Sequence, residues 1–163
     1  MHLSAHDRSN RFSAWALVPA ALVITVLAVP YLIARGWLVV AIPLQHGFAL
    51  VCHQRPERSF WIFGAPVAVC ARCLGIYCGA ALCCLLRISR QVAFRLLLVA
   101  AAINALDAAT ELAGLHGNWL GVRFVLGVGL GAAAAAMIAA SVRESQPPAE
   151  INASFAAPAQ MPR

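Results

Sequence analysis

The amino-acid sequence predicts an all-α membrane protein, a bundle of about four transmembrane helices with an interfacial or re-entrant segment and a short cysteine-rich hairpin loop. Three observations predict this fold class. Hydrophobic residues make up 62% of the 163 positions and charged residues only 11%, which excludes an ordinary water-soluble domain. The mean hydropathy is +0.79. Polar breaks divide the chain into apolar stretches near the ~20 residues that a bilayer core requires.

The stretches expected to cross the membrane share this length and are mostly flanked by arginine. They are residues 15–34, 71–86, 94–115 and 119–142. The first is as long as a span and lacks a clear cleavage site, so we expect a retained anchor rather than a signal peptide. Residues 14–143 then form a single membrane domain, between an N-terminal tail (1–13) and a disordered C-terminal tail (144–163) that lacks helical periodicity.

The segment from Gly36 to Val51 is apolar but marginal in length for a crossing, and Pro43 and His46 interrupt it. We interpret it as interfacial or re-entrant. The positive-inside rule favours this interpretation, because an even number of spans places most span-flanking arginines on one side. That side would hold Arg8, Arg11, Arg87, Arg90, Arg95 and Arg143, and the other side Arg35, Arg55 and Arg58.

This count predicts a multi-pass protein of the cell (inner) membrane with both termini cytoplasmic and the Cys52 to Cys70 segment exterior or periplasmic. The net charge of +6 reflects twelve arginines against six acids. Because the arginines lie mostly at span ends, and not on a soluble face between aromatic residues, nucleic acid is not an expected partner. The lipid bilayer is the expected partner, through its headgroups.

Residues with chemical potential concentrate between the first two predicted spans. They form three motifs: Cys52-His53-Gln54, Pro56-Glu57-Arg58-Ser59 and Cys70-x-Arg72-Cys73-x-Gly75-Ile76-Tyr77. At these motifs the chain resembles an uncharacterised bacterial and archaeal membrane-protein family, domain of unknown function 2085. The resemblance runs from Cys52 to about Gly131. It implies a small multi-span bundle whose residues of interest are Cys52, His53, Arg58, Cys70, Cys73, Gly75 and Tyr77.

The cysteine segment also carries donors suited to a metal ion. Cys70 and Cys73 form a Cys-x-x-Cys pair, in which two sulfurs can reach one ion, and Cys52 and His53 offer further sulfur and nitrogen donors. Zinc or another transition metal is the expected ion. Adjacent residues seldom bind one ion together, so Cys52 is the stronger candidate and His53 an additional one.

Neighbouring residues are expected to support this site. Arg58 and Arg72 place positive charge near the sulfurs, and cations favour the thiolate that binds metals and attacks electrophiles. The family resemblance adds Tyr77 to these supporting residues. The sequence contains no zincin helix, nucleotide-binding glycine loop or serine nucleophile elbow, so it assigns no enzyme class.

The same cysteines allow two other interpretations. In a membrane thiol-disulfide oxidoreductase, Cys70 and Cys73 would cycle between dithiol and disulfide while Cys52 exchanges with a partner. In a purely structural role, Cys52 would form a disulfide or all three would simply pack. Packing is the expected role of Cys78, Cys83 and Cys84.

Polar residues also occur inside the third and fourth predicted spans. Asn104, Asp107 and Glu111 recur at intervals of three and four, so they share one helix face that must point inward. Asn118, in the turn that follows, and Arg123 are also expected to be intramembrane polar residues. Glu111 and Arg123 lie at comparable distances from this turn, which predicts an ion pair between them. Such a pair either fixes helix register or, with Asp107, lines a pathway in a small oligomeric transporter or channel, the third functional class.

Glycines spaced by four residues predict close helix packing, in Gly75 with Gly79 and in Gly127 with Gly131. These pairs suit contacts within one chain or in a homo-oligomer equally well. The sequence therefore predicts an integral membrane protein that binds a metal ion through a Cys/His cluster at the membrane surface, with redox and transport as the alternatives.

Overall fold

The computed structural model describes residues 5–83 and 88–144. Within these residues the chain is mainly helical, with a short hairpin before the third helix. The elements are α1 (Ala5–Ala34), α2 (Leu38–Ala49), the 3-10 turn η1 (Pro56–Arg58), β1 (Trp61–Ile62), β2 (Ala65–Pro66), α3 (Ala71–Cys83), α4 (Arg90–Leu112) and α5 (Leu120–Glu144). The predicted all-α class is confirmed.

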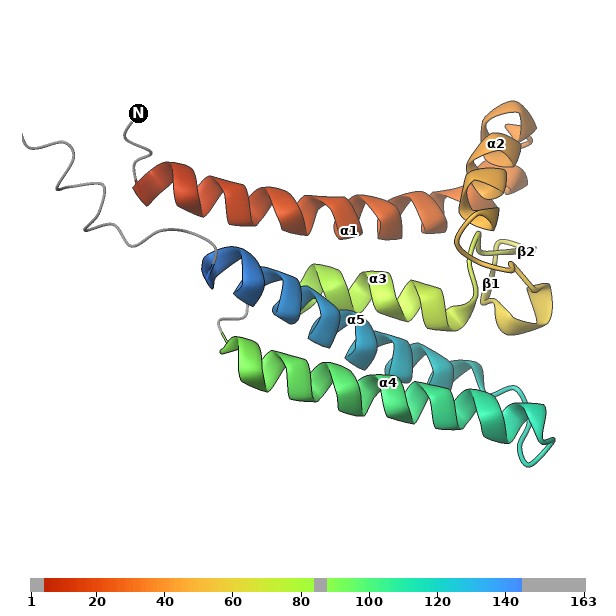
Figure 1. The fold of residues 1–163 in the computed structure, drawn as a ribbon. Coiled ribbons are helices and arrows are strands. Elements are labelled where there is room, and N and C mark those ends of the chain that lie inside the picture. Colours follow the sequence, from red (N-terminus) through yellow and green to blue (C-terminus); the bar gives the residue numbers. More distant parts are fainter. Residues whose placement is uncertain (1–4, 84–87, 145–163) are drawn as a thin grey trace, which may run out of the picture.

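The four helices α1, α3, α5 and α4 lie side by side in that order, and α2 lies across one end of the row (Figure 1). The extensive contacts are those of α3 with α5, α5 with α4, and α3 with α1. The arrangement is therefore an open row with α1 and α4 at its edges. The start of α1 and the end of α5 lie at the end away from α2 (Figure 1).

Three helices have the length and hydropathy to cross a membrane: Leu17–Ala34 within α1, Arg90–Leu112, and Leu120–Glu144. Only 11% of the Arg90–Leu112 stretch is buried, so most of its surface is available to lipid. The described part of the span predicted over residues 71–86 is helix α3. Its 13 residues reach about 20 Å at 1.5 Å per residue, against a hydrocarbon core of ~30 Å. A bundle of four spanning helices is thus not confirmed.

The first helix begins earlier than predicted, and two predicted segments extend into residues that the structure does not describe. Helix α1 begins at Ala5, inside the predicted N-terminal tail, although its stretch of spanning hydropathy begins only at Leu17. Residues 84–86 of the second predicted span and residues 145–163 of the C-terminal tail lie outside the described residues. The Gly36 to Val51 segment forms α2, whose 12 residues are too short to cross a bilayer.

Glycines place α3 against α5 with almost no separation. A Cβ atom added at Gly75 or Gly79 would overlap backbone atoms of α5, and one added at Gly127 or Gly131 would overlap backbone atoms of α3. The four positions interleave, so each helix offers a groove to the other. The predicted close packing is therefore a contact within one chain, and it fixes the height of the α3 start relative to α4 and α5.

The β1–β2 hairpin reverses the direction of the chain, so that Cys70 lies close to Cys52. Ile62 pairs with Ala65, and the two residues between them, Phe63 and Gly64, have positive φ angles of 53° and 77°. Two successive residues in this region make the tight turn that matches strand twist. The following residues 67–69 are at most 2% exposed and pack against α1, which anchors the chain just before Cys70.

Candidate metal centre

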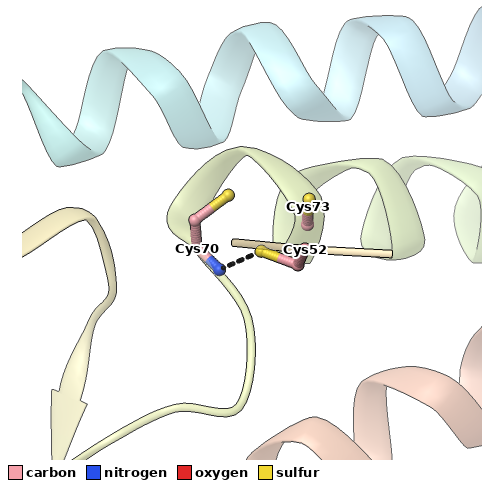
Figure 2. Close-up of side chains that lie close together, drawn as sticks. All are labelled: Cys52, Cys70 and Cys73. Carbon is pink, nitrogen blue, oxygen red and sulfur yellow. Dashed lines mark hydrogen bonds between the residues drawn. The ribbon is translucent and has the colours of Figure 1, made fainter. Parts of the chain in front are cut away.

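Three cysteine sulfurs meet at the end of the row where α2 and the hairpin lie. The Sγ atoms of Cys52, Cys70 and Cys73 all lie within 4.8 Å of one another. Figure 2 shows the three side chains gathered at the start of α3, with the backbone N–H of Cys70 directed at the sulfur of Cys52. All three cysteines carry free thiols. The predicted convergence of these residues is confirmed, and they lie close enough to hold a metal ion.

Each sulfur is positioned by a different structural feature. Cys52 follows α2 and is 6% exposed. Cys70 precedes α3, and its carbonyl accepts the N–H of Leu74 at 3.0 Å, as an N-terminal capping residue does. Cys73 lies in the first turn of α3. The end of α2 and the start of α3 therefore bring the three sulfurs together.

The sulfur of Cys52 accepts hydrogen bonds from neighbouring groups. The Cys70 backbone N–H donates to its Sγ at 3.2 Å. The thiols of Cys70 and then Cys73 donate to the same sulfur and, with that N–H, hold the pKa of Cys52 well below its usual range, against the opposing effect of burial. Cys52 is therefore the thiolate of the group.

Gln54 ties together the backbone on both sides of the site. Its Nε2 donates to the carbonyls of Gln45 and Ala68, at 2.5 and 2.7 Å. The residue adopts a φ of 49°, in the left-handed region that non-glycine residues enter at a cost. The two hydrogen bonds offset that cost and fix the path of the chain directly after Cys52. The sequence alone did not indicate this role for Gln54, although the residue belongs to the first motif.

Ser59 of the second motif and Asn118, which lies outside the motifs, hold the loop between Cys52 and the hairpin. Ser59 is 1% exposed, and its Oγ donates to the Arg55 carbonyl at 3.0 Å. Asn118, from the turn between α4 and α5, donates through Nδ2 to the carbonyl of Glu57. Asn118 was predicted as an intramembrane polar residue, and the structure shows it as a link between that turn and the loop.

A pocket of about 210 Å³ opens beside the sulfurs. It contains donors of two kinds, thiols and guanidinium groups. Its lining comprises Val51, Cys52, His53, Gln54, Arg55, Arg58, Cys70, Arg72, Cys73 and Arg123. The residues of the three sequence motifs thus form one cavity together with Arg123 of α5, which lies far from them in the sequence.

Ion pairs join this pocket to α4. Arg72 pairs with Asp107, which also has the His116 ring nitrogen at 3.7 Å. Arg123 pairs with Glu111, and Arg58 of the loop pairs with the same carboxylate at 3.0 Å. The predicted Glu111–Arg123 pair is confirmed. The Arg58–Glu111 and Arg72–Asp107 pairs were not predicted, because the partners lie far apart in the sequence.

Asn104 serves the packing of α4 against α5. Its Nδ2 donates to the carbonyl of Leu126 at 3.1 Å as well as to Ala100 in its own helix, at 2.9 Å. The side chain is buried at 7% exposure. The inward direction predicted for the Asn104, Asp107 and Glu111 face is therefore confirmed, since each of the three contacts another element.

The remaining predicted residues lie around the site. His53 is exposed and lines the pocket, but it is not part of the group of three close sulfurs. The ring of Tyr77 packs against the ring of Phe48, with 6.5 Å between the ring centroids, and this contact joins α3 to α2. Cys78 lies beside the hydrophobic core. Cys84 lies outside the described residues, and so does the side chain of Cys83.

Comparison with known proteins places these features in a family. A family described as "Predicted membrane protein (DUF2085)" matches residues 52–137, from the first cysteine of the site into α5. An uncharacterised protein of Methanocaldococcus jannaschii is 34% identical over 116 residues, covering 64% of this chain and 74% of that protein. An uncharacterised protein of Methanothermobacter thermautotrophicus is 52% identical over 33 residues, covering 20% of this chain and 30% of that protein.

No solved structure matches the chain. The family match covers more than half of the chain and includes all three cysteines, the four pocket arginines and both carboxylates of α4. The chain therefore belongs to the DUF2085 family of predicted membrane proteins.

Proposed function

We propose that this membrane protein binds a transition metal ion, with zinc as the best match, through Cys52, Cys70 and Cys73. The observation that carries the proposal is the mutual approach of the three Sγ atoms to within 4.8 Å. Zinc binds cysteine sulfur at about 2.3 Å, so two sulfurs on one tetrahedral ion lie about 3.8 Å apart. Small side-chain rotations would bring the three sulfurs to this separation.

The surroundings support a thiolate site with one position left open. Three protein ligands plus an open fourth position characterise catalytic zinc, whereas structural zinc has four protein ligands. The pocket gives the fourth position access to water, to a substrate or to His53. The low pKa of Cys52 provides one sulfur already deprotonated. The donor set is therefore suited to a metal centre that can also bind a further ligand.

The site is proposed to lie at the membrane surface, on the exterior or periplasmic side. Trp37, Trp61 and Trp119 are 60–64% exposed, and each belongs to the end of the row that holds the sulfurs (Figure 1). Exposed tryptophans mark the interface between hydrocarbon and water. In this arrangement α3 completes a fourth crossing together with the residues that flank it, and α2 lies at the interface.

Metal content of the purified full-length protein tests the proposal. We expect close to one zinc or similar ion per chain in elemental analysis of the wild type, and loss of most of it in Cys70→Ala, because only two sulfurs remain. Cys78→Ala is the matched control: this cysteine is also in α3 but outside the group of three. Its metal content should equal that of the wild type.

Thiol counting makes the test independent of metal carried through purification. Bound metal should protect about three thiols from alkylation until a chelator is added. Absence of metal together with full thiol reactivity before any treatment would show that the proposal is wrong. Equal metal contents in Cys70→Ala and the wild type would contradict the assignment of ligands.

A thiol-disulfide oxidoreductase is the second candidate, and the stabilised thiolate of Cys52 favours it. Cys52 would attack a disulfide of a partner protein, releasing one partner thiolate and leaving a mixed disulfide. The thiol of Cys70 or Cys73 would then displace the partner's second sulfur. The partner disulfide is reduced and the protein's own pair oxidised. Thiols that become reactive only after a reductant is added, in protein without metal, would favour this function.

A further inference from the structure

The pocket beside the sulfurs has a second feature, an excess of guanidinium groups that metal binding does not require. Arg55, Arg58, Arg72 and Arg123 all line it. The carboxylates paired with these groups are Asp107 and Glu111. Four guanidinium groups against two carboxylates leave two positive charges, and the Cys52 thiolate offsets one of them. A zinc ion with three thiolates would also carry one net negative charge, so the pocket is cationic with or without the metal.

Two of these guanidinium groups retain buried hydrogen-bond donors without a partner. The side chain of Arg123 is 5% exposed, and its Nε has no hydrogen-bond partner within the described part of the chain. The Nε of Arg72 is also buried and has no hydrogen-bond partner among the described residues. Buried donors that lack an acceptor destabilise a protein, and structures normally satisfy them. Both residues line the pocket, so a ligand that enters it can supply the missing acceptors.

We infer that the pocket binds a small oxyanion of the phosphate class. Guanidinium groups donate pairs of hydrogen bonds to phosphate oxygens, and the net positive charge of the pocket attracts an anion. The volume of about 210 Å³ is below the ~300–1,000 Å³ of pockets that enclose drug-sized ligands. A phosphate or a phosphomonoester headgroup fits, and a larger ligand would have to extend out of the opening.

The phosphate could come from solution or from an anionic lipid, because the pocket lies at the end of the row with the exposed tryptophans. The inference does not depend on a bound metal. The arginines supply the groups that bind phosphate, and the cysteines beside them supply the groups that bind metal. An experiment can therefore disprove one function without disproving the other.

Arg55→Gln is the test variant. Arg55 is exposed and has no ion pair within residues 5–83 and 88–144, so its replacement leaves the pairs of Asp107 and Glu111 intact. Arg95→Gln is the matched control, since Arg95 is also exposed but lies near the start of α4, at the opposite end of the row (Figure 1). Both changes remove one positive charge.

Calorimetric titration of inorganic phosphate into the detergent-solubilised full-length protein is the first arm. Saturable binding that weakens about tenfold or more in Arg55→Gln, and stays within about twofold of wild type in Arg95→Gln, supports a site for soluble phosphate. Retention of the same affinity in Cys70→Ala would show that phosphate binding and metal binding are separate.

Native mass spectrometry after reconstitution with phosphatidylcholine and phosphatidic acid is the second arm. Phosphatidic acid retained by wild type and Arg95→Gln, but lost from Arg55→Gln, supports a lipid headgroup as the ligand even where inorganic phosphate does not bind. The inference is overturned if neither ligand binds, or if Arg55→Gln and Arg95→Gln weaken both ligands equally, which would indicate only general charge attraction.

Discussion

The backbone N–H of Cys70 donates a hydrogen bond of 3.2 Å to the sulfur of Cys52, across 18 positions of sequence. The contact exists because the hairpin reverses the chain and residues 67–69 anchor it against α1. Metal or disulfide chemistry at this site therefore depends on the hairpin fold as well as on the cysteines themselves.

The pKa of Cys52 gives the first prediction. In metal-free protein its thiolate should persist as the pH falls from about 8 to about 6, where an ordinary cysteine becomes protonated. The hydrogen bonds from the Cys70 and Cys73 thiols cause this persistence. The difference in ultraviolet thiolate absorbance between wild type and Cys52→Ser measures it. Cys70→Ala removes the largest cause, so its signal should decline within that pH range.

The contribution of the Cys52 thiolate to folding stability depends on pH. Because the folded-state pKa of Cys52 lies below the unfolded value, the stability that its thiolate contributes is present above the unfolded pKa and is lost as the pH falls through the folded pKa. A thiolate signal that already disappears near pH 8 in the wild type would contradict the hydrogen-bond arrangement.

The contact between α3 and α5 gives the second prediction. Gly131→Ala should lower the free energy of unfolding by about 1–3 kcal/mol, because the added Cβ would overlap the backbone of Ile76. Gly129→Ala is the control on the same helix, with open space around its Cβ position. It should be neutral or stabilising by up to about 1 kcal/mol, since alanine favours the helix.

Thermal unfolding in one detergent compares these two variants. Similar melting temperatures for Gly131→Ala and Gly129→Ala would show that α3 and α5 are not in close contact.

The carboxylate of Glu111 gives the third prediction. Glu111→Gln should destabilise the protein by about 3 kcal/mol or more, because it leaves the buried Arg123 without its counter-charge. Glu144→Gln breaks the Arg90–Glu144 pair, in which both side chains are 56% exposed, and should change stability by less than about 1 kcal/mol. Chemical denaturation of both variants measures the difference.

A variant of Asp107, the other ion-paired carboxylate of α4, addresses the transport alternative. If Glu111 and Asp107 only fix helix register, Asp107→Asn should lower stability while metal content stays at the wild-type level. A pathway for protons or cations would instead require a change in ion flux across vesicles that contain the variant. The transporter or channel function stays a prediction until flux is measured.

Membrane orientation gives the fourth prediction. Alkaline phosphatase fused after Val51 should be active, because that position is expected outside the cytoplasm, and a fusion after Arg90 should be inactive. Green fluorescent protein at the same positions should give the opposite pattern. A cytoplasmic position for Val51 would remove the argument for an exported disulfide and leave metal binding as the stronger function.

Sequence patterns were reliable where the physical cause is local. Hydrophobic composition determined the membrane class, and the three-and-four spacing of Asn104, Asp107 and Glu111 determined that they share an inward face, since both depend on neighbouring residues along one helix. The short hairpin loop expected from the sequence is present, and it brings Cys70 next to Cys52.

The sequence by itself determined the membrane class, the approximate positions of the apolar helices, and the cysteines that form the site. Only the tertiary structure decided that His53 lies outside the group of close sulfurs, that Arg72 pairs with Asp107, and that Arg123 lines the same pocket. The physical reason is that these relationships depend on the rotation and height of α3 against α5. Backbone contacts at their interleaved glycines set both, and no spacing within a single helix records them.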